Sequence, residues 1–178
     1  MSEKRNVPQL RFQEYSEPWV QKKLKDFASV KRGAGSQYIT YVQDPDDGIR
    51  LIRIGDFLEN NPVFVERTAE IERFILEEGD ILIAGTGATA GITFLVPPQF
   101  VGLAYSYNAP KIKVSKNSIP FTIYYLRSNQ ILKQQKRLFT GNAQPFLDTT
   151  AISNFKIYTT SLPEQQKIAA ILSSVDEA

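Results

Sequence analysis

The chain has 178 residues, of which 42% are hydrophobic and 22% charged, so it can form one compact domain with a buried core. It contains no Cys and no His, which excludes thiol nucleophiles, disulfides, Ser-His-Asp triads and nearly every zinc, haem or iron–sulfur site. The 21 basic and 19 acidic residues leave a net charge of +2, which favours no class of partner. Because no segment resembles a signal peptide or a membrane span, we expect a soluble, cytoplasmic protein.

The N-terminal part combines a polar segment with a few large apolar residues. Trp19 is expected to anchor this segment on the core. Leu24 and Phe27 recur at helical spacing, which predicts one or two helical turns within residues 19–28. A glycine-rich loop around Gly33 follows.

Strands are predicted for the middle of the chain, where short runs rich in β-branched and aromatic residues alternate with turn sequences. The turn sequences include PDDG at 45–48, ENNP at 59–62 and EEGD at 77–80. The predicted strands are 38–42, 49–54, 63–65, 74–76, 80–84, 92–96, 101–103 and 109–114.

Helical features begin at Ser118. This residue is a suitable N-cap, Pro120 falls in the first turn, and the apolar spacing that follows predicts one amphipathic helix up to Phe139. The helix ends before a polar loop, and a last strand is predicted within 152–159.

A second helix is predicted after Ser161, which is spaced to form a capping box with Glu164. Its apolar face has no C-cap or glycine stop before the end of the sequence. The helix either packs back on the domain or pairs with a protein partner, and the unterminated apolar face favours pairing. The apolar residues are Ile168, Ile171, Leu172 and Val175.

These elements indicate a single mixed domain of the α+β class. We expect a twisted, mostly antiparallel sheet with flanking helices, and a C-terminal helix that begins a spacer or coiled-coil helix.

The sequence GTGATAG at 85–91 contains the pattern G-x-G-x-x-A of a dinucleotide-binding loop. The residues after it favour a strand rather than the required helix, and no Asp or Glu follows before Asp148. We therefore predict a hairpin. Its small residues serve either a tight turn with positive φ or the close approach of backbone amides to a ligand such as phosphate.

Two clusters of carboxylates raise the question of a metal or nuclease site. Their spacing fits neither a calcium loop nor a two-carboxylate nuclease, so we interpret them as solvated turn residues and expect no metal and no cofactor. The clusters are Asp44, Asp46 and Asp47, and Glu77, Glu78 and Asp80.

Charge is segregated along the chain. Residues 81–147 contain no Asp or Glu and carry +7, so the rest of the chain carries −5 to give the net charge of +2. Such a block favours a face that meets a nucleic acid, and nearby Tyr and amide side chains suit base stacking and base pairing contacts. The basic residues are Lys111, Lys113, Lys116, Arg127, Lys133, Lys136 and Arg137, and the others are Tyr105, Tyr107, Asn108, Asn142 and Gln144.

Four parts of the chain carry recognisable segments. They are VPQLRFQEYSEPWVQKKLKDFA at 7–28, GIRLIRIGDF at 48–57 with EEGDILIAGTGATAG at 77–91, GNAQPFLDTTAISNFKI at 141–157, and LPEQQKIAAIL at 162–172. In this order they resemble the target-recognition domain of the specificity subunit of type I restriction-modification systems. The last of these is the most specific.

The resemblance implies a subunit without catalysis of its own, which reads one half of a split double-stranded DNA site and positions adenine methyltransferase and restriction subunits. It divides the chain into a recognition domain at 1–160 and the start of a spacer helix at 161–178, a half-subunit. One alternative is an interaction protein that dimerises, or competes with a full specificity subunit, through this helix. A nucleotide-binding enzyme ranks last.

The resemblance and the basic block together predict the residues of the DNA site. Those expected to face DNA are Ser36, Tyr38, Thr86, Thr89, Tyr105, Tyr107, Asn108, Lys111, Lys113, Asn142 and Gln144. The apolar face of the C-terminal helix is expected to meet a partner helix through Ile168, Ile171, Leu172 and Val175.

Overall fold

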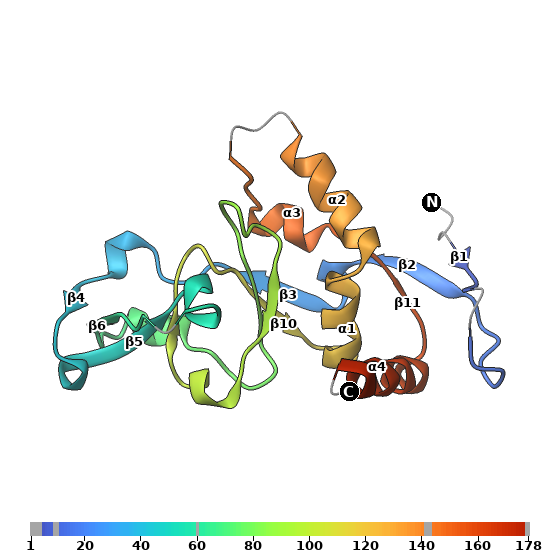
Figure 1. The fold of residues 1–178 in the computed structure, drawn as a ribbon, viewed down its shortest axis with the longest axis horizontal. Helices are drawn as coiled ribbons and strands as arrows, with labels where there is room; N and C mark the ends of the chain where they lie inside the picture. Colours follow the sequence, from blue (N-terminus) through green and yellow to red (C-terminus); the bar gives the residue numbers. More distant parts are fainter. Residues whose placement is uncertain (1–4, 9–10, 60, 141–143, 177–178) are drawn as a thin grey trace.

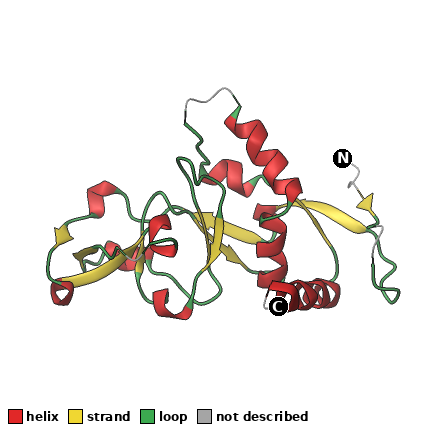
Figure 2. Cartoon of the chain, in the orientation of Figure 1, coloured by secondary structure: helices red, strands yellow, loops and turns green. Residues whose placement is uncertain are grey.

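The structure is a computed structural model that describes residues 5–8, 11–59, 61–140 and 144–176. Three small sheets follow one another along the long axis of the molecule, and the α-helices cover the central and right-hand sheets in Figure 1. The mixture of sheets and helices, visible in Figure 2, confirms the α+β class. The prediction of one sheet is wrong, because the short strands form three separate sheets.

Strand pairing is antiparallel throughout the described sheets except between β5 and β9. The first sheet has the order β1 (Arg5–Asn6), β2 (Trp19–Lys23), β11 (Lys156–Thr159). The second has the order β3 (Ala28–Lys31), β10 (Lys111–Val114), β7 (Ile81–Ile83), β8 (Thr93–Leu95). The third has the order β4 (Tyr41–Val42), β6 (Phe64–Glu66), β5 (Gly48–Ile52), β9 (Ala104–Tyr105).

The helices lie mainly in the second half of the chain. The α-helices of the described ranges are α1 (Ile119–Leu126), α2 (Asn129–Phe139), α3 (Thr149–Ser153) and α4 (Leu162–Asp176). The 3-10 turns are η1 (Leu24–Asp26), η2 (Ser36–Tyr38), η3 (Pro45–Asp47), η4 (Ile54–Phe57), η5 (Ile71–Phe74) and η6 (Pro98–Phe100). Within these ranges, no helix has the length and apolar character needed to cross a membrane.

The hydrophobic core consists of three clusters. The largest lies between the helices and the first two sheets and includes Leu24, Phe121 and Ile152. The third sheet separates the two smaller clusters, because successive side chains of a strand point to opposite faces. Leu51 belongs to one of these clusters and Ile52 to the other.

Strand β2 replaces the helical turns predicted within residues 19–28. It pairs with β11, so long-range strand pairing overrides the local spacing of Leu24 and Phe27, and only the turn η1 remains. The anchoring role predicted for Trp19 is confirmed. Its ring packs edge-on against Phe121 with 5.9 Å between the ring centroids.

The strands predicted at 74–76 and 101–103 are wrong. Residue 74 ends η5, Gly102 adopts a positive φ of 83°, and β9 begins only at Ala104. Leu76 still donates a backbone hydrogen bond to the Leu103 carbonyl, at 2.9 Å. Short apolar runs can reach the core from turns as well as from strands, so their apolar character does not define the element.

The helix predicted up to Phe139 is two helices. Ser118 caps α1 as predicted, accepting a hydrogen bond from the amide of Phe121. The chain then becomes extended at Ser128, which is the N-cap of α2. Ser disfavours helix interiors and favours caps, which explains the break.

The strand predicted within 152–159 is confirmed only in its second half. Residues 149–153 form α3, which Asp148 caps by accepting a hydrogen bond from the amide of Ala151 at 2.6 Å. Strand β11 begins at Lys156.

Candidate functional site

A hollow of about 800 Å³ lies where four loops meet beside the third sheet. The loops follow β3, β5 and β9, and the fourth is the glycine hairpin between β7 and β8. Five of the residues predicted from sequence line this hollow: Ser36, Thr86, Thr89, Tyr107 and Asn108. The fold therefore collects in one place hydroxyl and amide side chains that the sequence predicts to act together.

Backbone hydrogen bonds hold the loops after β3 and β9 against each other. The amide of Ala34 donates to the carbonyl of Tyr105 at 2.8 Å, and the amide of Tyr107 donates to the carbonyl of Ala34 at 2.9 Å. A Cβ atom at Gly33 would overlap the carbonyl groups of Tyr105 and Ser106. Glycine is therefore required at residue 33 for the two loops to approach.

The prediction of a hairpin for residues 85–91 is confirmed, since β7 and β8 are antiparallel neighbours. Gly87 and Gly91 have positive φ angles of 77° and 93°, as the tight-turn interpretation requires. The amide of Gly85 donates to the carbonyl of Asn108 at 2.9 Å, and that of Gly87 donates to the carbonyl of Pro145 at 3.1 Å. The hairpin is thus tied to the loop after β9 and to the segment before α3.

Gln144 lies between α2 and α3. Gln144 is exposed, and its Nε2 atom would lie 3.9 Å from a Cβ atom built on Gly87, which puts it next to the hairpin. Asn142 lies outside the described residues.

Arg32 was missed by sequence reasoning. Its guanidinium carbon lies 4.3 Å from the ring centroid of Tyr107 and 5.1 Å from that of Phe146, so it makes cation–π contacts with both rings. Tyr107 and Phe146 are each more than two-fifths exposed. No signal in the sequence brings these three distant residues together. Tyr41 and Arg53 also line the hollow without having been predicted.

Two predicted tyrosines serve the core instead. Tyr105 is 1% exposed and donates a hydrogen bond from its hydroxyl to the carbonyl of Arg32 at 3.2 Å. Burial, and then the charge of Asp80, raise the pKa of this phenol. Tyr38 is half-buried and packs on Phe74, with 5.6 Å between the ring centroids. Tyr105 is therefore not available to a ligand in this structure.

Lys111 and Lys113 lie on β10, away from the hollow. The ammonium of Lys111 is buried, 2.9 Å from Oδ2 of Asp80 and 2.9 Å from the carbonyl oxygen of Ile75. Lys113 is exposed and pairs with Glu77. The interpretation of Asp80 as a solvated turn residue is wrong, because its carboxylate is fully buried against Lys111. These pairs favour a structural role for both lysines.

The other predicted turn carboxylates are exposed, as expected. Asp44 accepts a hydrogen bond from the amide of Asp46 at 3.0 Å at the start of η3. Among the described residues, no group of three or more Asp or Glu is arranged to hold a metal ion.

Helix α4 is anchored by its first turns. The Gln165 side chain accepts a hydrogen bond from the amide of Ser118 at 2.9 Å and donates to Thr159 Oγ1 and to the carbonyl of Thr160, at 2.9 and 2.7 Å. The Glu164 carboxylate does not form the predicted capping box with Ser161. It instead binds Arg11 through two hydrogen bonds of 2.7 and 2.8 Å and also accepts from Trp19 and Thr160.

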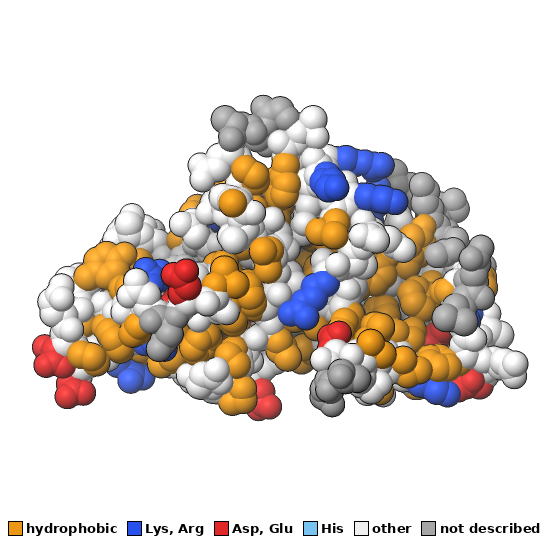
Figure 3. All heavy atoms as spheres, viewed as in Figure 1, with side chains coloured by type: hydrophobic (Ala, Val, Ile, Leu, Met, Phe, Trp, Pro, Cys, Tyr) orange, Lys and Arg blue, Asp and Glu red, His pale blue; other side chains and the backbone are white. Residues whose placement is uncertain are grey.

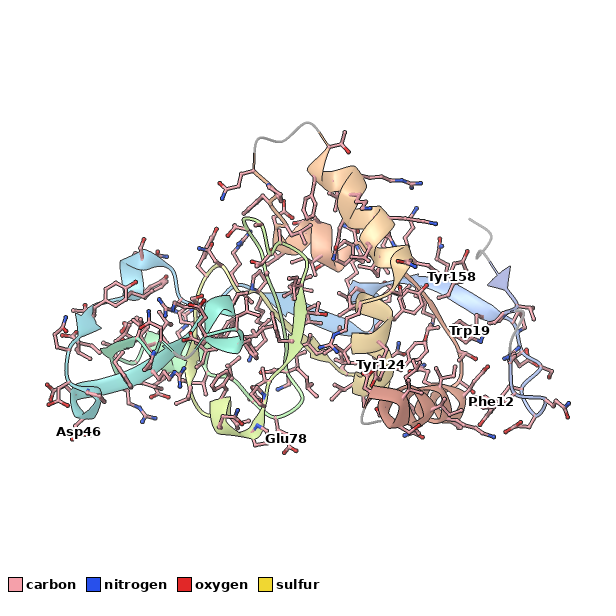
Figure 4. All side chains as sticks on the ribbon, viewed as in Figure 1. Phe12, Trp19, Asp46, Glu78, Tyr124 and Tyr158 are labelled. Carbon is pink, nitrogen blue, oxygen red and sulfur yellow. The ribbon has the colours of Figure 1, made fainter. Side chains whose placement is uncertain are left out.

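The later turns of α4 carry the predicted apolar face. Ile168 packs against the core, whereas Ile171, Leu172 and Val175 are exposed by 50%, 39% and 67%. Ile168, Ile171 and Leu172 border a second hollow of about 370 Å³ together with Phe12 and Trp19, which Figure 4 labels beside α4. The helix therefore docks by one side and leaves the apolar residues of its later turns partly exposed.

This α+β fold, with a hollow built from loops and a terminal helix, is that of a DNA specificity domain. The chain belongs to the family described as the type I restriction modification DNA specificity domain, which matches residues 16–178. It is similar to the type I restriction enzyme MjaVIII specificity subunit of Methanocaldococcus jannaschii, with 25% identity over 181 residues that cover 92% of this chain and 40% of that protein.

Solved structures share the fold. The S subunit of a type I restriction-modification system from M. genitalium has a TM-score of 0.62 and 17% identity, over 96% of this chain and 42% of that one. The HsdS subunit from Thermoanaerobacter tengcongensis has a TM-score of 0.64 and 19% identity, over 93% of this chain and 44% of that one. The chain thus spans less than half the length of each of these relatives.

Proposed function

We propose that this chain is a non-catalytic module that recognises a double-stranded DNA sequence through the loops around the 800 Å³ hollow. The observation that carries the proposal is the convergence of Ser36, Thr86, Thr89, Tyr107 and Asn108, in a member of a DNA specificity family. Side-chain amides and hydroxyls are the groups that read base edges in the major groove.

The chemistry of the individual side chains supports sequence reading. An amide such as Asn108 can pair bidentately with adenine, which is worth about 1–3 kcal/mol of discrimination against another base. Thr86 and Thr89 add hydroxyl groups that donate or accept. Exposed Tyr107, stacked on Arg32, adds a rigid aromatic surface.

By analogy with the subunits it resembles, the module would read one half of a bipartite target. Residues 1–160 would form the recognition domain, and residues 161–178 would begin a helix that positions methyltransferase and restriction subunits. Within the described part of α4, the exposed Ile171, Leu172 and Val175 are the candidate contact for such a partner.

The test is a selection of binding sites from random duplex DNA with the purified chain, repeated with Asn108→Ala. We expect the variant to lose preference at one base position of the selected site while its affinity for unrelated DNA is unchanged. Asn129→Ala, an exposed asparagine at the start of α2, is the matched control and should keep the full preference. An equal loss of specific and unspecific binding in Asn108→Ala would contradict base reading by this residue.

A second candidate function is helix-mediated association, in which α4 of one copy pairs with another copy or with a full specificity subunit. The uncovered apolar face of α4 favours it. Sedimentation equilibrium of the chain over a wide concentration range tests self-association directly.

A further inference from the structure

Helix α2 carries an uncompensated row of positive charges. It contains Lys133, Lys136 and Arg137 but no Asp or Glu, and all three side chains are exposed. Like charges spaced by three or four residues repel each other on a helix surface. The helix dipole explains the two cations of the last turn, but it does not explain Lys133.

A second pair of uncompensated charges lies in the first sheet. Lys23 of β2 and Lys156 of β11 are directly opposite each other in the antiparallel register, so their side chains share one face of the sheet. Both are exposed, and opposed like charges destabilise a strand pair. Nothing in the described residues forms an ion pair with either lysine.

Gln134 brings the two sets of charges together. Its side chain donates to the carbonyl of Lys156 at 2.9 Å and accepts from the amide of the same residue at 2.8 Å. Lys133 and Arg137 flank Gln134 on the exposed side of α2. Figure 3 shows Lys and Arg side chains gathered over α2. We call this surface the basic patch: Lys23, Lys133, Lys136, Arg137 and Lys156.

Two carboxylates close in sequence to the basic patch accept hydrogen bonds from the backbone. Asp26 of η1 accepts from the amide of Lys23 at 2.8 Å, and Asp148 accepts from the amide of Ala151 at 2.6 Å. The fold therefore concentrates five positive charges whose mutual repulsion is not relieved by an ion pair within the described residues.

The side of α2 that faces away from the basic patch contacts the glycine hairpin, whose Thr86 and Thr89 line the hollow. Gln135, which is buried, donates to the carbonyl of Gly91 at 3.2 Å, at the end of the glycine hairpin. A Cβ atom at Gly91 would lie 2.5 Å from Oε1 of Gln135, so the hairpin and α2 are in close contact. A duplex seated on the hairpin therefore has α2 as its neighbour.

From these contacts we propose that the basic patch binds the phosphate backbone of the duplex beside the recognised bases, without regard to sequence. The proposal rests on the proposed function of DNA recognition. It separates two tasks, because the side chains of the hollow select bases whereas the patch supplies affinity through the release of counterions.

The test measures the affinity of the full chain for a duplex of unrelated sequence at several salt concentrations. In the triple variant Lys133→Gln, Lys136→Gln, Arg137→Gln, the log-log salt slope should become shallower by about 0.9 for each phosphate that is no longer neutralised. If each of the three side chains neutralises one phosphate, the decrease in affinity between about 50 and about 200 mM salt should be about 40-fold smaller than in the wild type. Lys23→Gln with Lys156→Gln should give a smaller change of the same sign.

The matched control is Lys22→Gln with Arg73→Gln. Lys22 adjoins Lys23 but points to the opposite face of the strand, and Arg73 lies on η5 in another part of the fold. An unchanged slope in both patch variants, or an equal change in the control, overturns the proposal while DNA recognition by the hollow stands. A wild type that binds no duplex at any salt concentration overturns both. Every variant should melt at or above the wild-type temperature, because only exposed charges are removed and the patch variants also relieve repulsion between like charges.

Discussion

The buried ammonium of Lys111, on β10, connects the central sheet to the segment that precedes β7. The ammonium contacts Asp80 and the carbonyl of Ile75, and it lies 5.2 Å from the ring centroid of Tyr105. Asp80 in turn accepts a hydrogen bond from the amide of Glu77 at 2.8 Å. Its other oxygen, Oδ1, is buried and has no hydrogen-bond partner in the described part of the chain, so Asp80 depends on Lys111 to balance its charge.

Lys111→Met is expected to lower the free energy of unfolding by about 3 kcal/mol, because it leaves the Asp80 carboxylate buried without its counterion. Urea unfolding followed by circular dichroism measures the loss. The salt dependence of DNA binding should stay unchanged, since the ammonium does not face the hollow.

Lys113→Met is the matched control, because Lys113 is exposed and pairs with Glu77 at the surface. It should cost less than about 1 kcal/mol. A stable Lys111→Met variant with weaker salt dependence would show that the lysine binds DNA after all.

The residues of the hollow differ in how far the sequence predicts them. Thr86, Thr89 and Asn108 are predicted because the family resemblance assigns the glycine hairpin and the loop after β9 to the DNA face. Arg32 is not, since its contacts with Tyr107 and Phe146 depend on three chain segments meeting. Charge counting likewise selected Lys111, whose counterion Asp80 adjoins a neighbouring strand and is visible only in three dimensions.

At the level of elements, the two halves of α4 differ: its first turns pack on the domain, and its later turns expose apolar side chains. The first turns are buried against α1 and β11 through Gln165 and Ala169. The later turns expose their apolar face beside the second hollow, as Figure 3 also shows in the hydrophobic side chains at the lower right.

Ile171→Asp is expected to leave the free energy of unfolding within about 0.5 kcal/mol of the wild type, because half of the side chain is already in water. If α4 pairs with a partner, the same change abolishes the association, since it puts a charge into an apolar interface. Sedimentation equilibrium and a urea melt of each protein measure the two effects.

The control is Gln166→Asp, which adds the same charge at an exposed position of the first turns. A monomeric wild type together with a strongly destabilised Ile171→Asp would mean that α4 docks only on its own domain.

The break between α1 and α2 shows why elements were harder to predict than fold class. Apolar spacing continues across Ser128, so periodicity alone predicts one helix. The same limit explains β2, whose partner β11 lies at the far end of the chain. The pattern within one segment indicates which of its residues are buried. Whether the segment becomes a helix, a strand or a turn depends on its pairing with other segments.

For the whole molecule, Glu164 links the N-terminal segment, β2 and α4. Burial would raise the pKa of its carboxyl, but hydrogen bonds from Arg11, Thr160 and Trp19 outweigh it and hold the pKa below the ordinary value of 4.5. The unfolded chain therefore binds this proton more readily than the folded one. The stabilisation is complete above about pH 4.5 and is lost as the pH falls through the folded pKa.

We therefore expect the free energy of unfolding to fall as the pH is lowered from about 5 to about 3. Urea melts at half-unit intervals of pH measure it. Glu164→Gln should be less stable than the wild type at pH 7, because Arg11 loses its counterion, and should show a weaker dependence on pH below 4.5. A variant with the wild-type pH dependence would contradict the role of this carboxyl. The exposed Glu14 and Glu77, whose pKa values are also lowered by their lysine partners, should contribute less.

The hydrogen bonds of the Gln165 side chain fix the rotation of α4 about its own axis, and so fix which of its faces is turned toward the hollow. Because Gln165 is bonded to Ser118, Thr159 and Thr160, the helix cannot turn about its own axis without breaking three hydrogen bonds. The direction in which Ile171 and Val175 point is thereby fixed relative to the loops that we propose to read DNA. One alanine inserted after Ala170 would advance these residues by about 1.5 Å and rotate them by about 100°. A partner bound to α4 should then have a different orientation relative to the DNA, although both binding surfaces keep the same side chains.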